Sequence, residues 1–250
     1  MRTTLILACA AAALIAAPAM TAAYKMPANV EAAVADAGRP DTDKELDAER
    51  KPAEMLVLAK VKPGARVMDL VPGRGYFTRL FSVAVGPTGY VYAYQPSEFD
   101  SFLKGKPAPV VVVAAAYKNV SVTHASANDL VAPESLDLVW TSQNYHDFHD
   151  SFAKPADLAL INKHVFDALK RGGLYIVLDH SAEKGSGLRD TETLHRIDEA
   201  TVKQEVLAAG FKLVSESNIL RNKEDDRTLK VFDPKIRHKT DQFILVFKKP

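Results

Sequence analysis

The sequence is nearly devoid of cysteine, with Cys9 as the only one among 250 residues. Cys9 lies in an N-terminal stretch that we expect to be removed, which would leave the mature chain without disulfides, thiolate metal ligands or a cysteine nucleophile. An excess of either charge is also missing, since 32 Lys and Arg residues are balanced by 31 Asp and Glu residues. This balance argues against nucleic acid or an anionic membrane as the main partner.

The apolar run near the N-terminus is too short to be typical of a membrane-spanning helix. It follows one basic residue, Arg2, and ends in small residues, with Ala17-Pro18-Ala19 and Thr21-Ala22-Ala23 as two cleavage patterns. We therefore expect a signal peptide over residues 1–23 and a periplasmic or secreted protein that does not contact the membrane after cleavage. An uncleaved membrane anchor is the alternative.

Residues 24–250 are predicted to form a single domain in which strands alternate with helices. A helical extension over residues 24–62 precedes the alternation, and Pro52 suits the first turn of its last helix. Strands are predicted over residues 65–71, 89–95, 119–126, 135–146, 173–182, 212–220 and 241–250. The segment "APVVVVAAAY", residues 108–117, fits either a strand or a helix, and the helix over residues 155–173 is expected to end at Gly172-Gly173.

This alternation predicts an α/β fold with a mostly parallel sheet covered on both faces. The last two strands have no helix between them, so they are expected to pair antiparallel. The predicted architecture is a Rossmann-like, doubly wound, seven-stranded sheet with an antiparallel C-terminal hairpin. Ligands in such sheets bind beyond the carboxyl ends of the strands.

The stretch "VMDLVPGRGYFT" places candidate binding residues at such a strand end. Asp69 closes an apolar strand, and Gly73 and Gly75 stand where a helix begins. Glycine allows a ligand to approach the backbone without a Cβ in the way. Arg74 between them either pairs with a carboxylate or phosphate of the ligand or points to solvent.

Five stretches resemble the class I S-adenosylmethionine-dependent methyltransferases: "VMDLVPGRGYFT", "GYVYAYQ", "SANDL", "LDLVWTSQNYH" and "LKRGGLYIVLD". The resemblance extends from about residue 52 to the last residue. It is closest to predicted exported methyltransferases of bacteria, through "RKPAE", "PGRGY", "NYHD" and "KTDQF". It implies S-adenosyl-L-methionine as cofactor and an unknown acceptor, which we expect to be a small molecule. No feature of the sequence predicts an oligomeric state.

The resemblance also implies roles for single residues. Asp69 would contact the methionine end of the cofactor, and Gln95 would stand where the family has an acid on the ribose. Asn128 or Asp129 would lie near the adenine. Together with the turn, the cofactor-binding candidates are Asp69, Gly73, Arg74, Gly75, Gln95 and Asn128. The acceptor would meet the methyl group near Asn144.

Three residues depart from the family pattern. Val71 replaces a glycine, and because a β-branched residue rarely takes positive φ, we expect a different backbone course there. Pro72 lacks an N–H, and Gln95 carries no charge. These departures favour an alternative function, a ligand-binding protein on a methyltransferase fold that has lost the cofactor.

The stretch "NYHDFHD" and the end of the fifth strand supply the catalytic candidates Tyr145, His146, Asp147 and His180. A histidine there can act as a general base, or these residues are polar loop residues that cap the next helix. A third interpretation is a hydrolase that holds a metal with His146, His149 and a carboxylate. Histidine spacing on a loop is weakly specific, so no metal is assigned.

Three arginines near the C-terminus and two further histidines are other polar residues of interest. The long segment over residues 221–240 carries Arg221, Arg227 and Arg237, which either cover the site and select an anionic acceptor or lie at a solvated hairpin tip. His124 and His195 are predicted to be packing or surface residues.

Overall fold

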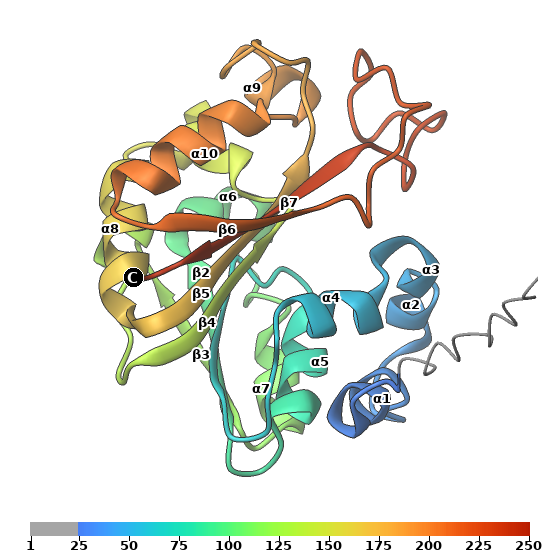
Figure 1. The fold of residues 1–250 in the computed structure, drawn as a ribbon, viewed down its shortest axis with the longest axis vertical. Helices are drawn as coiled ribbons and strands as arrows, with labels where there is room; N and C mark the ends of the chain where they lie inside the picture. Colours follow the sequence, from blue (N-terminus) through green and yellow to red (C-terminus); the bar gives the residue numbers. More distant parts are fainter. Residues whose placement is uncertain (1–24) are drawn as a thin grey trace, which may run out of the picture.

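The structure is a computed structural model that describes residues 25–250, so the expected signal peptide lies outside the described residues. A seven-stranded sheet with the order β3-β2-β1-β4-β5-β7-β6 forms its centre (Figure 1). The strands are β1 (Arg66–Leu70), β2 (Tyr90–Pro96), β3 (Val120–Ala125), β4 (Leu136–Ser142), β5 (Leu169–His180), β6 (Lys212–Ser217) and β7 (Gln242–Lys248). Only β7 runs antiparallel, against both β5 and β6. The predicted fold class is confirmed.

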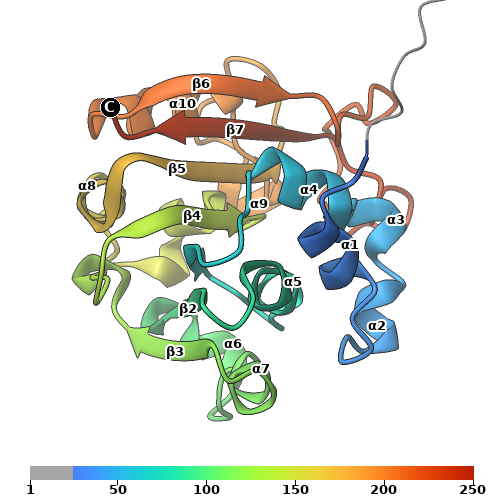
Figure 2. The ribbon, with the colours of Figure 1, turned by 60° about the horizontal axis from the view of Figure 1, so that its bottom comes forward.

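The helices form two layers around the sheet. They are α1 (Ala28–Val34), α2 (Asp41–Lys44), α3 (Asp47–Arg50), α4 (Pro52–Leu58), α5 (Tyr76–Val85), α6 (Asp100–Leu103), α7 (Val111–Ala116), α8 (Leu158–Ala168), α9 (Thr191–Leu194) and α10 (Glu199–Ala208). One face is covered by α1, α4 and α5, which lie together in Figure 2. The opposite face is covered by α8 and α10.

Side chains of each central strand alternate between the two cores. Along β7, Phe243, Leu245 and Phe247 enter the core under α8 and α10, whereas Ile244 and Val246 enter the core under α5. This alternation follows from the two-residue period of a strand. It explains why β7 reads as a continuous apolar run, because both of its faces are buried.

Two local predictions are resolved by packing. Residues 111–116 form a helix, because Val113 is buried whereas Val111 and Val112 are exposed, a pattern that a helix produces. Helix α8 ends at Ala168 rather than at the two glycines. Leu169 already pairs with Leu136 in the sheet, so the chain has entered β5 before it reaches Gly172.

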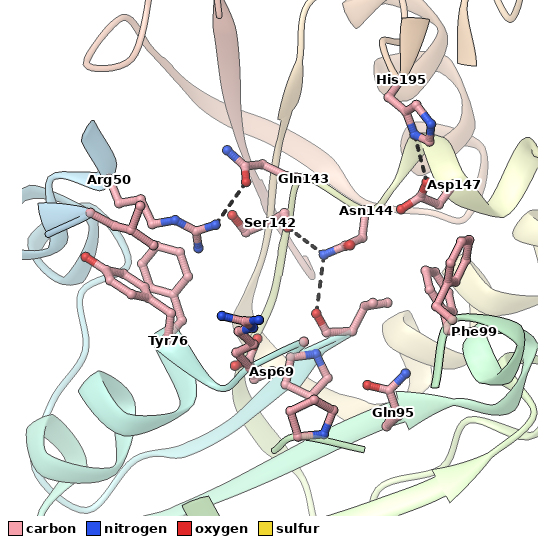
Figure 3. Close-up of a pocket in the computed structure, with 18 of the residues that line it drawn as sticks. Arg50, Asp69, Tyr76, Gln95, Phe99, Ser142, Gln143, Asn144, Asp147 and His195 are labelled. Atoms are coloured by element: carbon pink, nitrogen blue, oxygen red, sulfur yellow. Dashed lines mark hydrogen bonds and ion pairs between the residues drawn. The ribbon is translucent and has the colours of Figure 1, made fainter. Parts of the chain in front are cut away.

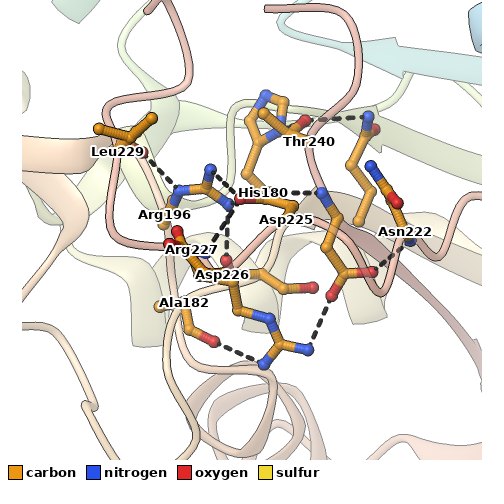
Figure 4. A network of polar contacts seen from close by, with 12 residues as sticks. His180, Ala182, Arg196, Asn222, Asp225, Asp226, Arg227, Leu229 and Thr240 are labelled. Atoms are coloured by element: carbon orange, nitrogen blue, oxygen red, sulfur yellow. Dashed lines mark hydrogen bonds and ion pairs between the residues drawn. The ribbon is translucent and has the colours of Figure 1, made fainter. Parts of the chain in front are cut away.

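The segment between β6 and β7 is held by a network of polar contacts (Figure 4). Arg196 forms two hydrogen bonds to Asp225, of 2.9 and 3.1 Å, in a fully buried pair. Arg227 donates to the carbonyl of Ala182 at 3.0 Å and forms an ion pair with Asp241.

No helix among residues 25–250 combines the length and the apolar character that crossing a membrane requires.

Candidate active site

A cavity of about 640 Å³ opens at the carboxyl edge of the sheet, where β1, β2, β4 and β5 end (Figure 3). Its wall also includes residues of α2 and α3 and residues Val231 and Phe232 before β7. The volume lies within the range of about 300–1,000 Å³ that is typical of small-molecule sites. The edge is the one at which doubly wound sheets bind ligands.

Asp69 lies at the cavity wall and is buried, with 3% of its surface exposed. Its Oδ2 accepts a hydrogen bond of 2.6 Å from the Thr78 hydroxyl. Burial raises the pKa of Asp69 to about 7, although the Thr78 hydrogen bond and the charge of Arg50 act in the opposite direction. A further cation beside it would lower the pKa of this carboxyl group and favour its ionised form.

Val71 has φ +59°, so the prediction of a different backbone course is wrong. Its N–H donates to the Tyr94 carbonyl at 2.9 Å, and its carbonyl accepts from Asn144 Nδ2 at 3.3 Å. These bonds to the ends of two neighbouring strands hold a conformation that a β-branched residue adopts only at a cost in strain. The turn keeps a left-handed residue at this position without a glycine.

The two glycines of the turn serve different purposes. Gly73 has φ +56° and lines the cavity, and a Cβ placed on it would meet nothing within 4 Å. Gly75 has φ +79°, and a Cβ there would lie 2.5 Å from Val113 Cγ2 of α7. Gly73 therefore leaves space for a ligand, whereas Gly75 leaves space for a neighbouring helix.

Of the other cofactor-binding candidates, Gln95 and Arg74 line the cavity and Asn128 does not. Gln95 is buried at the cavity wall, and its Nε2 makes only a long contact of 3.4 Å with the Pro96 carbonyl. Arg74 lines the cavity from an exposed position. Asn128 does not line it, because its amide donates to the Pro155 carbonyl at 3.0 Å and accepts from the Asp157 N–H at 2.8 Å.

Arg50 of α3 is a cavity residue that the sequence analysis missed. Its guanidinium carbon lies 4.8 Å from the centre of the Tyr76 ring, and its Nη2 donates to Gln143 Oε1 at 3.1 Å (Figure 3). Its Nε is buried and has no hydrogen-bond partner among residues 25–250. The stretch "RKPAE", which begins at Arg50, is the sequence signal that pointed to it.

His146 and Asp147 follow β4 on the short 3₁₀ helix η3 (His146–His149). His146 Nδ1 lies 2.8 Å from Asp179 Oδ1, and its Nε2 lies 3.2 Å from Asp147 Oδ1. Burial alone would lower the pKa of His146, but the two carboxylates raise it to about 10. The protonated ring cannot accept a proton, which argues against the predicted general-base role.

The pKa of His180, at the end of β5, is shifted in the opposite direction from that of His146. Its Nδ1 lies 2.8 Å from the Thr240 hydroxyl, and burial lowers its pKa to about 3, despite the attraction of Asp179. The imidazole is therefore neutral at physiological pH. A base with so low a pKa is weak near neutrality, so His180 is better suited to shape the cavity that it lines.

Two residues of the "NYHDFHD" stretch point away from the cavity. The Tyr145 hydroxyl donates to Glu205 at 2.9 Å and accepts from Asn162 at 2.9 Å. His149 Nε2 lies 3.2 Å from Glu205 Oε1. Because His149 turns toward Glu205 while His146 turns toward Asp147 and Asp179, the alternative metal site of His146 and His149 is not assembled.

His195 takes the place beside His146 instead, which corrects its prediction as a packing or surface residue. It ends α9 with φ +53° and lines the cavity. Its Nδ1 lies 3.5 Å from Asp147 Oδ1 (Figure 3). The same atom lies 3.2 Å from His146 Nε2, and the His195 ring packs 5.0 Å from that of Phe232. No motif in the sequence signalled this residue.

The long segment before β7 contributes apolar rather than basic side chains. Val231 and Phe232 line the cavity, whereas Arg221 donates to Ser181 Oγ at 2.9 Å and pairs with Glu199. Arg227 is held by Ala182 and Asp241, and neither arginine lines the cavity. Phe102 of α6 also lines the cavity, and both phenylalanines are more than half exposed.

No protein-family model and no curated protein matches this sequence. Solved structures do match in fold. A SAM-dependent methyltransferase from Aquifex aeolicus superposes with a TM-score of 0.56 at 17% identity, over 85% of this chain and 99% of that chain.

Two further solved structures, a fibrillarin and a cyclase, also match in fold. Fibrillarin from Aeropyrum pernix, solved with natively bound S-adenosyl-L-methionine, has a TM-score of 0.50 at 17% identity, over 81% of this chain and 76% of its own. The [4+2]-cyclase SpnF has a TM-score of 0.55 at 18% identity, over 83% and 80%. The topology and these superpositions agree that the chain has the fold of the class I S-adenosylmethionine-dependent methyltransferases.

Proposed function

We propose that the protein binds S-adenosyl-L-methionine in the cavity at the carboxyl edge of the sheet and transfers its methyl group to a small acceptor molecule. The observation that carries the proposal is the position of Arg50 and the buried Asp69 on the wall of one cavity, which also contains Gly73 and Gln95. A guanidinium and a carboxyl group on one cavity wall suit a ligand that carries both a carboxylate and an ammonium group.

The residues of the cavity fit the chemical groups of this cofactor. Arg50 suits the carboxylate of the methionine part, and Asp69 suits its ammonium group. The open space at Gly73 admits a ligand close to the backbone. Gln95 presents a side-chain amide that is nearly free to bond the ribose hydroxyls, although without the charge of a carboxylate.

The cofactor supplies a methyl group on a sulfonium that is already a good leaving group, so the chain contributes mainly position. Asn144 holds the end of β4 against the turn through its bond to the Val71 carbonyl. Burial alone would raise the pKa of Asp147, but hydrogen bonds from His146 and His195 lower it. Asp147 is therefore ionised and can accept a hydrogen bond from an acceptor hydroxyl.

Calorimetric titration of the purified protein with S-adenosylmethionine and S-adenosylhomocysteine tests the proposal. We expect one site per chain, and Arg50→Ala should weaken binding at least tenfold, because removing a charged hydrogen bond costs about 1.5–3 kcal/mol. Arg171→Ala, an exposed arginine outside the cavity, is the matched control. Absence of binding to either compound would contradict the proposal, and the cavity would then be assigned to another ligand.

A further inference from the structure

We propose that His146, Asp147 and His195 form a binding site for a divalent transition-metal ion, with zinc as the best fit, on the part of the cavity wall made by η3 and the end of α9. The three side chains come from two elements that are distant in the sequence. The site differs from the metal site considered from the sequence, which relied on His149. It extends beyond methyl transfer and does not depend on it.

The spacing of the three candidate ligand atoms carries the proposal. His146 Nε2 lies 3.2 Å from His195 Nδ1 and 3.2 Å from Asp147 Oδ1, and the latter two atoms are 3.5 Å apart. With zinc bonds of about 2.0–2.2 Å, tetrahedral ligands stand about 3.3–3.6 Å from one another. The triangle therefore already has nearly the size that a tetrahedral ion requires.

A further carboxylate orients one of the ligands. Asp179 is fully buried, and its Oδ1 lies 2.8 Å from His146 Nδ1 while its Oδ2 accepts the His146 backbone N–H at 2.9 Å. Metal-binding histidines almost always give their second nitrogen to such a partner, which fixes the ring and leaves the other nitrogen for the metal. The arrangement of Asp179 and His146 has this form, with Nε2 directed at the triangle.

The charges around the triangle also favour a cation. Two buried carboxylates, Asp147 and Asp179, adjoin His146. A divalent ion bound to neutral imidazoles would balance both carboxylates.

The packing of His195 also suits a ligand role. The residue has a left-handed backbone, and its ring rests against Phe232, which fixes its direction toward His146. All three ligands line the cavity, so a fourth coordination position is open to water or to an oxygen atom of a bound molecule.

Zinc titration of untagged protein, stripped with a chelator and competed against a chromophoric chelator, tests the site directly. We expect one tight site per chain. Replacing zinc with cobalt should give the visible absorption bands of tetrahedral coordination. His195→Ala should weaken binding more than 100-fold, because it removes a ligand, whereas loss of an outer partner typically costs 10- to 100-fold.

His149→Ala is the matched control, because His149 lies on the same 3₁₀ helix but contacts Glu205. It should bind zinc like the parent. Binding that is equally strong in His195→Ala and the parent would overturn the proposal, as would parent protein that takes up less than one ion per chain. Should His195→Ala fail to fold, the cobalt spectrum of the parent decides, since surface histidines and carboxylates do not give tetrahedral bands. None of these measurements uses an adenosyl compound, so failure here leaves the proposed function untouched.

Discussion

Asp69 is an ionisable side chain that the fold holds almost entirely away from water, at the point where β1 ends. Burial raises its pKa from the usual value for an aspartate to about 7. Its folded-state pKa therefore exceeds its unfolded pKa. The protein binds more protons when folded, so the contribution of Asp69 to stability is complete below about pH 4 and is lost as the pH rises through 7.

We expect Asp69→Asn to remove this dependence on pH. Without ligand, the variant should gain unfolding free energy relative to the parent between pH 4 and pH 7, by an amount on the order of 4 kcal/mol if the whole pKa shift is expressed. Denaturant unfolding at several pH values measures it. Asp41→Asn, whose side chain is 93% exposed, should keep the parent's dependence on pH. If the unfolding free energy of Asp69→Asn differs from that of the parent by the same amount at every pH, Asp69 is not buried as described.

Gly73 offers a second test at the scale of one residue. We expect Gly73→Val to abolish binding of S-adenosylhomocysteine in a calorimeter, because its side chain would extend into the cavity. Gly187→Val is the control, since Gly187 has a similar φ of +61° and open space around its Cβ but lies outside the cavity. Both variants should lose similar stability from backbone strain, about 1–2 kcal/mol. Equal affinity in Gly73→Val and the parent would exclude this turn from the ligand site.

At the scale of elements, the turn after β1 is the point where a strand, two helices and the N-terminal extension meet. Tyr76, at the start of α5, donates a hydrogen bond of 2.7 Å to Asp47 of α3. Arg79, also of α5, donates to Asp43 of α2 at 3.0 Å. These bonds place the extension over the cavity and bring Arg50 to its wall.

The close approach of α7 to this turn predicts a packing defect in Gly75→Ala. The added Cβ would meet Val113 at 2.5 Å, so we expect a loss of about 2–4 kcal/mol from overpacking together with the left-handed backbone. Adding Val113→Ala should restore part of this loss, because it removes the methyl group in the way. A double-mutant cycle from denaturant unfolding measures the coupling. Additive effects of the two substitutions would show that the contact does not exist.

At the scale of the whole molecule, export remains our prediction from the sequence. The segment over residues 1–23 has the order of a signal peptide. We expect mass spectrometry of protein recovered from the periplasm or medium to show an N-terminus near residue 20 or 24. Recovery of a chain that still begins with Met1 would contradict removal of the segment.

Much of the fold was predictable because its signals are local. Strands and helices alternate in the sequence, and the rule that parallel strands end at one edge placed Asp69, Gln95 and His146 together. Arg50 and His195 were not predictable in this way. Their positions depend on how α3 and α9 pack against distant strands, which no periodicity records. Val71 was mispredicted because two long-range hydrogen bonds outweigh its intrinsic preference.

The wall of the cavity joins segments that are far apart along the chain, from Arg50 in α3 to Phe232 before β7. The extension is also attached to the C-terminal part, since Lys51 Nζ donates to the Ile219 carbonyl at 2.7 Å and His238 pairs with Glu49 at 2.7 Å. An occupant of the cavity would act as a non-covalent cross-link between these segments. Its presence should therefore slow amide hydrogen exchange and proteolytic cutting in both segments at once, because neither can open without releasing it.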